Sequence, residues 1–135
     1  NSSGILILLI TITASLRSLI HMHCKIEAQR LICHLVKMAP STVSPFITDR
    51  LVPYFANILR KDSDHRIRGE AICSLTDLLE QLVTIPASDS NIFTDYLMEI
   101  LIKSLEVEKS VYVRIRMAQN VDRLSKIALN ILSLS

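Results

Sequence analysis

Apolar residues recur every three or four positions through most of the chain, the spacing that places side chains on one face of an α-helix. Between residues 43 and 61 this stripe consists of Ile47, Leu51, Phe55, Ile58 and Leu59. After a polar break at residues 62–64, a second stripe consists of Ile67, Ala71, Leu75, Leu78, Leu79 and Leu82. The pattern predicts two helices joined by a short turn, and Pro53 should kink the first helix or remove one of its hydrogen bonds.

The same pattern returns 46 residues later, with apolar residues matching apolar residues and the turn acid matching an acid. The matched positions are Ile47-Thr48-Asp49 with Phe93-Thr94-Asp95, Leu51 with Leu97, Phe55 with Leu101, Leu59 with Leu105, Asp62 with Glu108, Ile67-Arg68 with Val113-Arg114, Leu75 with Val121 and Leu78 with Leu124. A weaker copy lies upstream at an offset of 43, where Lys25 takes the place of Arg68. These matches indicate an internal repeat.

The repeat predicts three helix pairs, with helices near residues 5–20, 25–39, 44–61, 65–84, 91–106 and 110–132. A period in the forties with two helices per unit is typical of HEAT and armadillo solenoids. We therefore expect an all-α fold, an α-solenoid of three HEAT-like helix pairs forming an armadillo-type superhelix. Residues 1–135 would be one such segment, with repeats at about 5–39, 44–84 and 91–132. Because the chain begins with Asn1, we expect it to be a fragment of a longer protein.

The pattern resembles the HEAT repeat in particular, because Pro53 lies in a first helix, Asp62 in the turn and Arg68 near the start of a second helix. In that family the turn acid caps the second helix and pairs with a basic residue of a neighbouring repeat. The resemblance implies a structural ladder made of the acids Asp62 and Glu108 and the bases Lys25, Arg68 and Arg114. Two positions depart from the pattern: Glu99 replaces the proline of the third repeat, and Leu19 replaces the turn acid of the first.

Composition supports long helices and gives little sign of a charged ligand. Half of the residues are hydrophobic, and only two are glycine. The net charge of +2 is too small to indicate a nucleic-acid or membrane partner. Arg60, Lys61, Arg66 and Arg68 form a local basic group, but a nucleic-acid groove would need more of them with aromatic residues between. We interpret them as a solvated repeat edge and expect no nucleic-acid partner.

The apolar stretch from Ile5 to Leu16 reaches Arg17 after about 12 residues, too few to span a membrane. A secretory signal would need basic residues before its apolar stretch, and none precedes this one. We therefore predict a helix that is buried on most sides. The three cysteines are odd in number and unpatterned, which favours free, buried thiols in a reducing compartment over a disulfide framework.

Candidate chemistry is sparse. His21, His23 and Cys24 form the most metal-like cluster, with Cys33 and His34 ten residues further on, but the paired spacings typical of zinc sites are missing. The group Asp62-Ser63-Asp64-His65 reads as a turn and helix cap. We found no phosphate-binding glycine loop and no hydrolase, kinase or metalloprotease signature. We assign no catalytic, cofactor or metal residue and no cofactor, although a small metal-dependent enzyme built on the His21 cluster stays as an alternative.

Three stretches carry a closer resemblance: "DRLVPYFANILRKDSDHRIRGEAICSLTDLL", "IPASDSNIFTDYLMEILIKSLE" and "VRIRMAQNVDRLSKIALNIL". They resemble the helical-repeat region of the phosphoinositide 3-kinase regulatory subunit 4 family, the protein-kinase-like regulatory subunits of class III phosphatidylinositol 3-kinase complexes. The resemblance covers about residues 5–132. It implies a parent with a serine/threonine kinase-like domain before these repeats and a WD40 propeller after them.

By this resemblance the segment is no enzyme but a protein–protein scaffold in autophagy and endosomal or vacuolar sorting. Its partners would be protein subunits of the lipid kinase complex. The resemblance implies a cytoplasmic protein, peripheral on endosomal and autophagic membranes through the complex or the parent chain. The alternative is a HEAT scaffold of another complex, such as a phosphatase regulatory subunit or a transport receptor.

Overall fold

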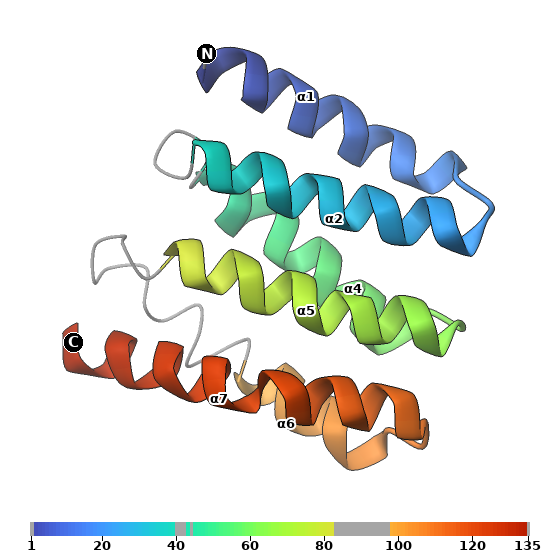
Figure 1. Ribbon diagram of the computed structural model, residues 1–135, viewed down its shortest axis with the longest axis vertical. Coiled ribbons are helices and arrows are strands. Elements are labelled where there is room, and N and C mark those ends of the chain that lie inside the picture. Colours follow the sequence, from blue (N-terminus) through green and yellow to red (C-terminus); the bar gives the residue numbers. More distant parts are fainter. Residues whose placement is uncertain (1, 40–42, 44, 83–97, 135) are drawn as a thin grey trace.

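The computed structural model describes residues 2–39, 43, 45–82 and 98–134, and every regular element within these ranges is helical. The α-helices are α1 (Ser2–Ser15), α2 (Met22–Met38), α4 (Val52–Lys61), α5 (His65–Leu82), α6 (Met98–Val107) and α7 (Val111–Leu134) (Figure 1). A short 3-10 turn, Leu16–Ser18, follows α1, and a π-helical turn, Ile47–Leu51, precedes α4. The predicted all-α class is confirmed. The predicted helical residues 44, 83–84 and 91–97 lie outside the described ranges.

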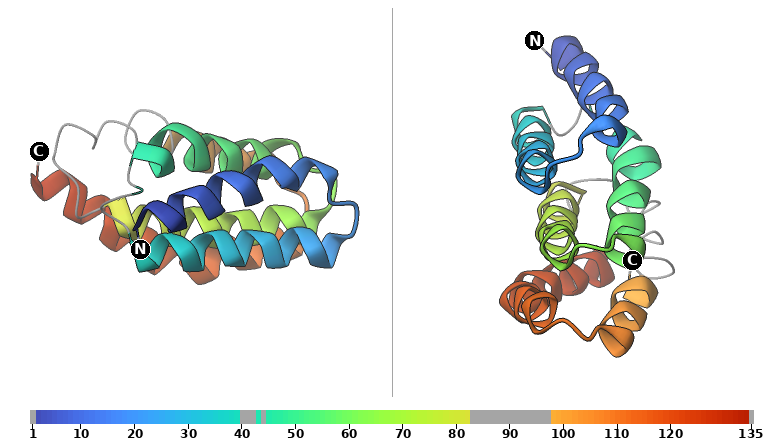
Figure 2. Two further views of the ribbon diagram at one scale, coloured as in Figure 1. Left: turned by 90° about the horizontal axis from the view of Figure 1, so that it is seen from above. Right: turned by 90° about the vertical axis from the view of Figure 1, so that its right-hand side faces the viewer.

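The helices form two layers, and the chain alternates between them. Helices α2, α5 and α7 lie side by side in one layer, while α1, α4 and α6 form the other (Figures 1 and 2). Helix α5 is the most enclosed, because it packs against α2 on one side, α7 on the other and α4 in the second layer. Residues 65–82 therefore contact both neighbouring helices of their layer.

The buried core of the middle helices follows the stripes that the sequence predicts, whereas Leu105 and Val121, the counterparts of Leu59 and Leu75 in the third repeat, are exposed. Phe55 is the largest fully buried side chain among the described residues, and its ring meets that of Tyr54 edge-on, with 5.2 Å between the ring centroids. The other core residues of the middle helices include Ile47, Leu51, Leu59, Ile67, Ala71, Ile72, Leu75, Leu78 and Leu79. Burial of these apolar side chains is the main favourable contribution to packing between the layers.

Pro53 interrupts its helix as predicted, and the interruption takes the form of a π-helical turn. The turn spans Ile47–Leu51, and Pro53 lies in the first turn of α4. Proline has no N–H to donate to a carbonyl one turn earlier, so the regular hydrogen-bond pattern cannot pass through this position. The wider turn still leaves Ile47 and Leu51 on the buried face.

The prediction that the N-terminal helix is buried on most sides is wrong. Leu9 is fully buried, but Ile7, Leu8 and Ile10 are 64%, 51% and 49% exposed. Among the described residues α1 packs mainly against α2, so the side chains that point away from α2 are exposed. No helix among the described residues is both long enough and apolar enough to span a membrane.

Candidate functional site

Salt bridges join the three helices of the α2–α5–α7 layer at two levels. Helix α5 supplies the central acids, Glu70 and Asp77, which are seven residues apart and therefore two helical turns apart on one face. Helices α2 and α7 supply bases at the same spacing, namely Arg30 with Lys37 and Arg116 with Arg123. Each level thus has the order base, acid, base across the layer, and we call this arrangement the charge ladder.

The first level is centred on Glu70, whose side chain is only 7% exposed. Arg30 donates from Nε to Oε1 at 3.0 Å, and Arg116 approaches Oε2 with Nη2 at 3.3 Å. Burial of a carboxylate is costly unless it is paired, and the two guanidinium groups meet this need from opposite sides. The hydrogen bond and charge of Glu70 also raise the pKa of Arg30.

The second level is centred on Asp77. Arg123 Nη2 donates to Oδ1 at 2.6 Å, and Lys37 Nζ lies 3.5 Å from Oδ2. Arg123 also pairs with Glu80, one turn further along α5, and Nε contributes a 3.2 Å hydrogen bond. Hydrogen bonds first to Glu80 and then to Asp77 raise the pKa of Arg123, so it is cationic at any physiological pH.

Uncharged polar contacts fill the space between the two levels. Cys33 donates its thiol hydrogen to the main-chain carbonyl of Ser74 at 3.8 Å, and burial raises the pKa of this thiol to about 12. On the other side of α5, Asn120 donates to Cys73 Sγ at 3.4 Å. Cys73 is half-buried, and burial raises its pKa as well. The expectation of buried thiols fails for Cys24, which is exposed near the start of α2.

Among the ladder residues predicted from the HEAT pattern, Arg68 makes the most complete contacts. Its Nε and Nη2 donate to Glu108 Oε1 at 3.1 and 2.9 Å, and its Nη1 donates to the main-chain carbonyl of Asp62 at 2.8 Å. Arg114 repeats the second contact, because its Nε donates to the carbonyl of Glu108 at 2.8 Å. Arg114 is exposed, and no carboxylate forms an ion pair with it within the described part of the chain.

The expected capping role of Asp62 belongs to Asp64 instead. Asp64 immediately precedes α5 and accepts a hydrogen bond from the N–H of Arg66 at 2.8 Å, as an N-cap residue does. Asp62 is two residues too early for that contact, and its Oδ1 accepts from the N–H of Asp64 at 2.9 Å. Hydrogen bonds from Arg66 lower the pKa of Asp64. Lys25 lines the same small cavity as Asp62, but it forms no ion pair among the described residues.

The other candidate chemistry of the sequence does not come together. No group of three or more His, Cys, Asp or Glu side chains among the described residues is arranged to hold a metal ion, and this includes His21, His23 and Cys24. In the basic group, Arg66 and Arg68 are each engaged by a carboxylate. The charges of these two arginines are therefore paired with Asp64 in the turn before α5 and with Glu108 after α6.

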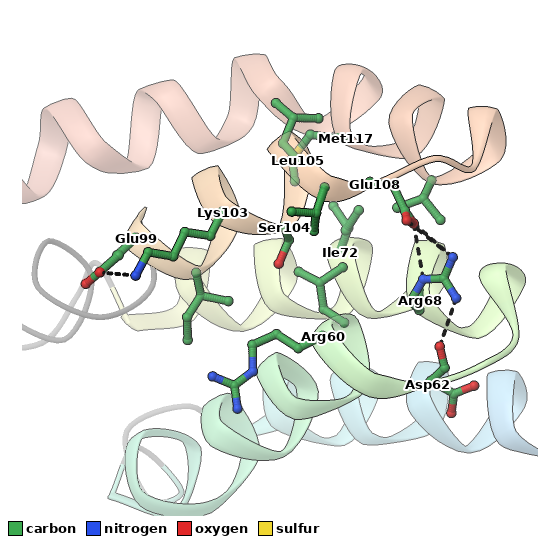
Figure 3. Close-up of a pocket in the computed structure, with 14 residues that line it drawn as sticks. Arg60, Asp62, Arg68, Ile72, Glu99, Lys103, Ser104, Leu105, Glu108 and Met117 are labelled. Atoms are coloured by element: carbon green, nitrogen blue, oxygen red, sulfur yellow. Dashed lines mark hydrogen bonds and ion pairs between the residues drawn. The ribbon is translucent and has the colours of Figure 1, made fainter.

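A cavity of about 580 Å³ lies where α4, α5, α6 and α7 meet (Figure 3). Arg68, Glu108 and Asp62 stand at one end of it, and Glu99 and Lys103, joined by a 2.6 Å ion pair, stand at the other. The rest of the lining is largely apolar and includes Leu59, Ile72, Ile100, Leu105, Val113 and Met117. This cavity was not predicted, because its size depends on how far α6 stands from its neighbours.

Sequence reasoning also missed the charge ladder, although a signal for it was present. Glu70 and Asp77 are followed 46 residues later by Arg116 and Arg123, so the charge is inverted at the repeat offset. The search for the repeat compared like residues with like and passed over positions of opposite charge. In the fold, those positions lie on facing sides of adjacent helices and pair with each other.

The fold and its site define an all-helical protein in which successive helices of one layer are bound together by buried and half-buried ion pairs. Comparison with known proteins identifies its family. The chain belongs to the PIK3R4-like family, and residues 8–135 match the family's middle domain. The resemblance seen in the sequence is thereby confirmed, and it is to a middle domain rather than to a kinase domain.

A curated relative is the probable serine/threonine-protein kinase vps15 of Dictyostelium discoideum, which is 26% identical over 116 residues. The matched region is 84% of this chain but only 6% of that protein, so the chain spans a small part of its relative's length. No solved structure matches the chain.

Proposed function

We propose that the chain is a scaffold segment of the regulatory subunit of a class III phosphatidylinositol 3-kinase complex. In this proposal its helices are three HEAT-like pairs, α1–α2, α4–α5 and α6–α7, stacked as a short α-solenoid of armadillo type. The segment itself carries out no reaction. It holds protein subunits of the lipid kinase complex in place during autophagy and endosomal or vacuolar sorting.

The observation that carries the proposal is the position of α5. This helix packs on both α2 and α7 within its layer, and Glu70 is bound from both sides by Arg30 and Arg116. In repeat proteins each unit contacts only its neighbours, and stability comes largely from the interfaces between units. A central helix that is paired with both neighbours supports a linear stack.

The family match favours this proposal over a phosphatase regulatory subunit or a transport receptor, since it concerns the middle domain of PIK3R4-like proteins. A stack of helix pairs also suits protein binding, because it presents long helical surfaces on a rigid core. The proposed location is cytoplasmic, on endosomal and autophagic membranes, with the membrane contact supplied by the complex or by other parts of the parent chain.

The proposal is tested by placing Leu75→Asp in the full-length regulatory subunit that contains this segment. Leu75 is 1% exposed in the centre of the stack, so a buried charge there disrupts the scaffold. We expect less lipid kinase catalytic subunit to be captured per regulatory subunit, together with weaker endosomal sorting. Lys109→Ala, at an exposed position, is the matched control. Unchanged capture with the Leu75→Asp subunit would show that the segment is no scaffold for the complex.

A further inference from the structure

Two cavities of the molecule occupy the same place in successive repeats. The smaller one, of about 170 Å³, is lined by Leu16, Leu19, Lys25, Gln29, Tyr54, Ile58, Asp62 and Ile67. Moved forward by the repeat offsets of 43 and 46, these residues become Leu59, Asp62, Arg68, Ile72, Ile100, Ser104, Glu108 and Val113, all of which line the cavity of about 580 Å³. Both cavities therefore lie between one helix pair and the next.

The larger cavity lies where two large side chains of the smaller cavity are replaced by smaller ones at the equivalent positions. Tyr54 and Ile58 line the smaller cavity from α4, and their equivalents on α6 are Ile100 and Ser104. An aromatic ring is thus replaced by a branched alkyl group, and an isoleucine by a serine. The volume that Tyr54 and Ile58 fill beside the smaller cavity is therefore not filled beside the larger one, and an apolar space remains there.

The charges around this space are unequally distributed. At one end Arg68 and Glu108 neutralise each other and Asp62 adds a negative charge, whereas at the other end Lys103 and Glu99 form a pair. Arg60 extends toward the Lys103 end and away from Arg68 (Figure 3). Arg60 is exposed and forms no ion pair within the described ranges, so that end carries an uncompensated positive charge.

We propose that this cavity is a peptide-binding site that takes a large aromatic side chain from a partner whose neighbouring residues are acidic. The aromatic side chain fills the space that Tyr54 and Ile58 occupy in the preceding repeat, and a carboxylate of the partner meets Arg60. The cavity volume lies within the range of ligand pockets, and its mostly apolar lining with a few polar groups at the ends is typical of them. The proposal rests on the proposed scaffold function, because it names the surface at which a partner binds.

In the test, each of three capped tripeptides is added to the 135-residue chain up to millimolar concentration. Binding is measured from changes in the amide chemical shifts of the chain. Phe-Asp-Asp is the probe, Ala-Asp-Asp removes the aromatic ring, and Phe-Lys-Lys reverses the charge. We expect Phe-Asp-Asp to shift the amides of Ile72, Ser104 and Leu105. The other two peptides should bind about tenfold more weakly or worse, because each lacks one of the two recognised features. Equal binding of the Phe and Ala peptides, or shifts confined to α1, would overturn the proposal.

Two variants of the chain complete the test. Ser104→Ile restores the residue of the preceding repeat and should abolish binding of Phe-Asp-Asp while the helix content and unfolding midpoint are maintained or raised. Arg60→Glu, at an exposed position, should weaken Phe-Asp-Asp and strengthen Phe-Lys-Lys. Unchanged binding by the Ser104→Ile chain excludes this cavity as the site, whatever the result for the full-length subunit. Conversely, peptide binding at the cavity with normal complex assembly by the Leu75→Asp subunit rejects the scaffold function alone.

Discussion

Glu70 and Arg116 occupy equivalent positions in successive repeats, 46 residues apart, and they are joined by an ion pair of 3.3 Å. The same relationship holds one level along the layer, where Asp77 pairs with Arg123. Equivalent positions on α5 and α7 therefore carry opposite charges. Because α2 places Arg30 and Lys37 on the other side, the central helix is held by electrostatic contacts in both directions.

Replacing Glu70 by Ala should destabilise the chain by about 1–3 kcal/mol, since it leaves Arg116 without its buried partner. Arg30 is largely exposed and contributes less. Urea unfolding followed by circular dichroism measures the loss. The matched control is the triple variant Arg30→Glu, Glu70→Arg, Arg116→Glu, which inverts the whole level. It should regain part of the lost stability, and a triple variant less stable than Glu70→Ala would contradict a role for charge pairing.

Leu75→Ala should cost about 2–5 kcal/mol, because it opens a cavity at a fully packed site. Its repeat equivalent, Val121, gives an internal control: Leu75 is 1% exposed and Val121 is 55% exposed. Val121→Ala should change the free energy of unfolding by less than about 0.5 kcal/mol. Similar losses at the two positions, measured by urea titration, would show that the two helices are packed alike.

Asp64→Ala should cost about 0.5–2 kcal/mol at neutral pH through loss of the N-cap of α5. The pKa of Asp64 is lower in the folded chain than in the unfolded one, so its contribution is complete above the unfolded value near 3.9 and is lost as pH falls through the lower, folded pKa. The difference in stability between the parent and variant chains should therefore shrink below about pH 4. Asp64→Asn, which retains a capping side chain, should lose less at pH 7.

Thiol labelling should separate the three cysteines. Cys24 is exposed and should react with a disulfide reagent in the native chain, Cys73 more slowly, and Cys33 only on unfolding. The physical reason for Cys33 is burial, which raises its pKa to about 12 and leaves it protonated at neutral pH. Mass spectrometry of partly labelled chains identifies the order. Early labelling at Cys33 would show that α2 and α5 do not enclose its thiol.

Filling the larger cavity should stabilise the chain in the absence of any partner. Ser104→Ile adds apolar side chain to a space lined by Ile72, Leu105 and Met117, and we expect a gain of about 0.5–2 kcal/mol. Ser104→Ala, which adds no volume, is the control. A lower unfolding midpoint for Ser104→Ile than for Ser104→Ala would mean that the cavity cannot accept a larger side chain without strain.

The helices and their order could be predicted from the sequence because both depend on local periodicity and on the 46-residue repeat. What periodicity could not supply was how many neighbouring helices cover each residue. Leu75 and Val121 match in the repeat, yet in the described part of the chain α5, which carries Leu75, packs between two helices of its layer, whereas α7, which carries Val121, packs against one. The same reason explains α1, which packs mainly against α2 and leaves Ile7 and Leu8 exposed.

The opposite charges at equivalent positions of α5 and α7 have a consequence for how such a protein can change over evolutionary time. If the unit containing α5 were duplicated in tandem, the copy of Glu70 would take the place of Arg116 and face the original Glu70. Two buried carboxylates would then oppose each other where an ion pair now stands. The segments that contain α5 and α7 therefore cannot replace one another unchanged, because a second copy of α5 would have to reverse the charges at these two positions before it could pack beside the original.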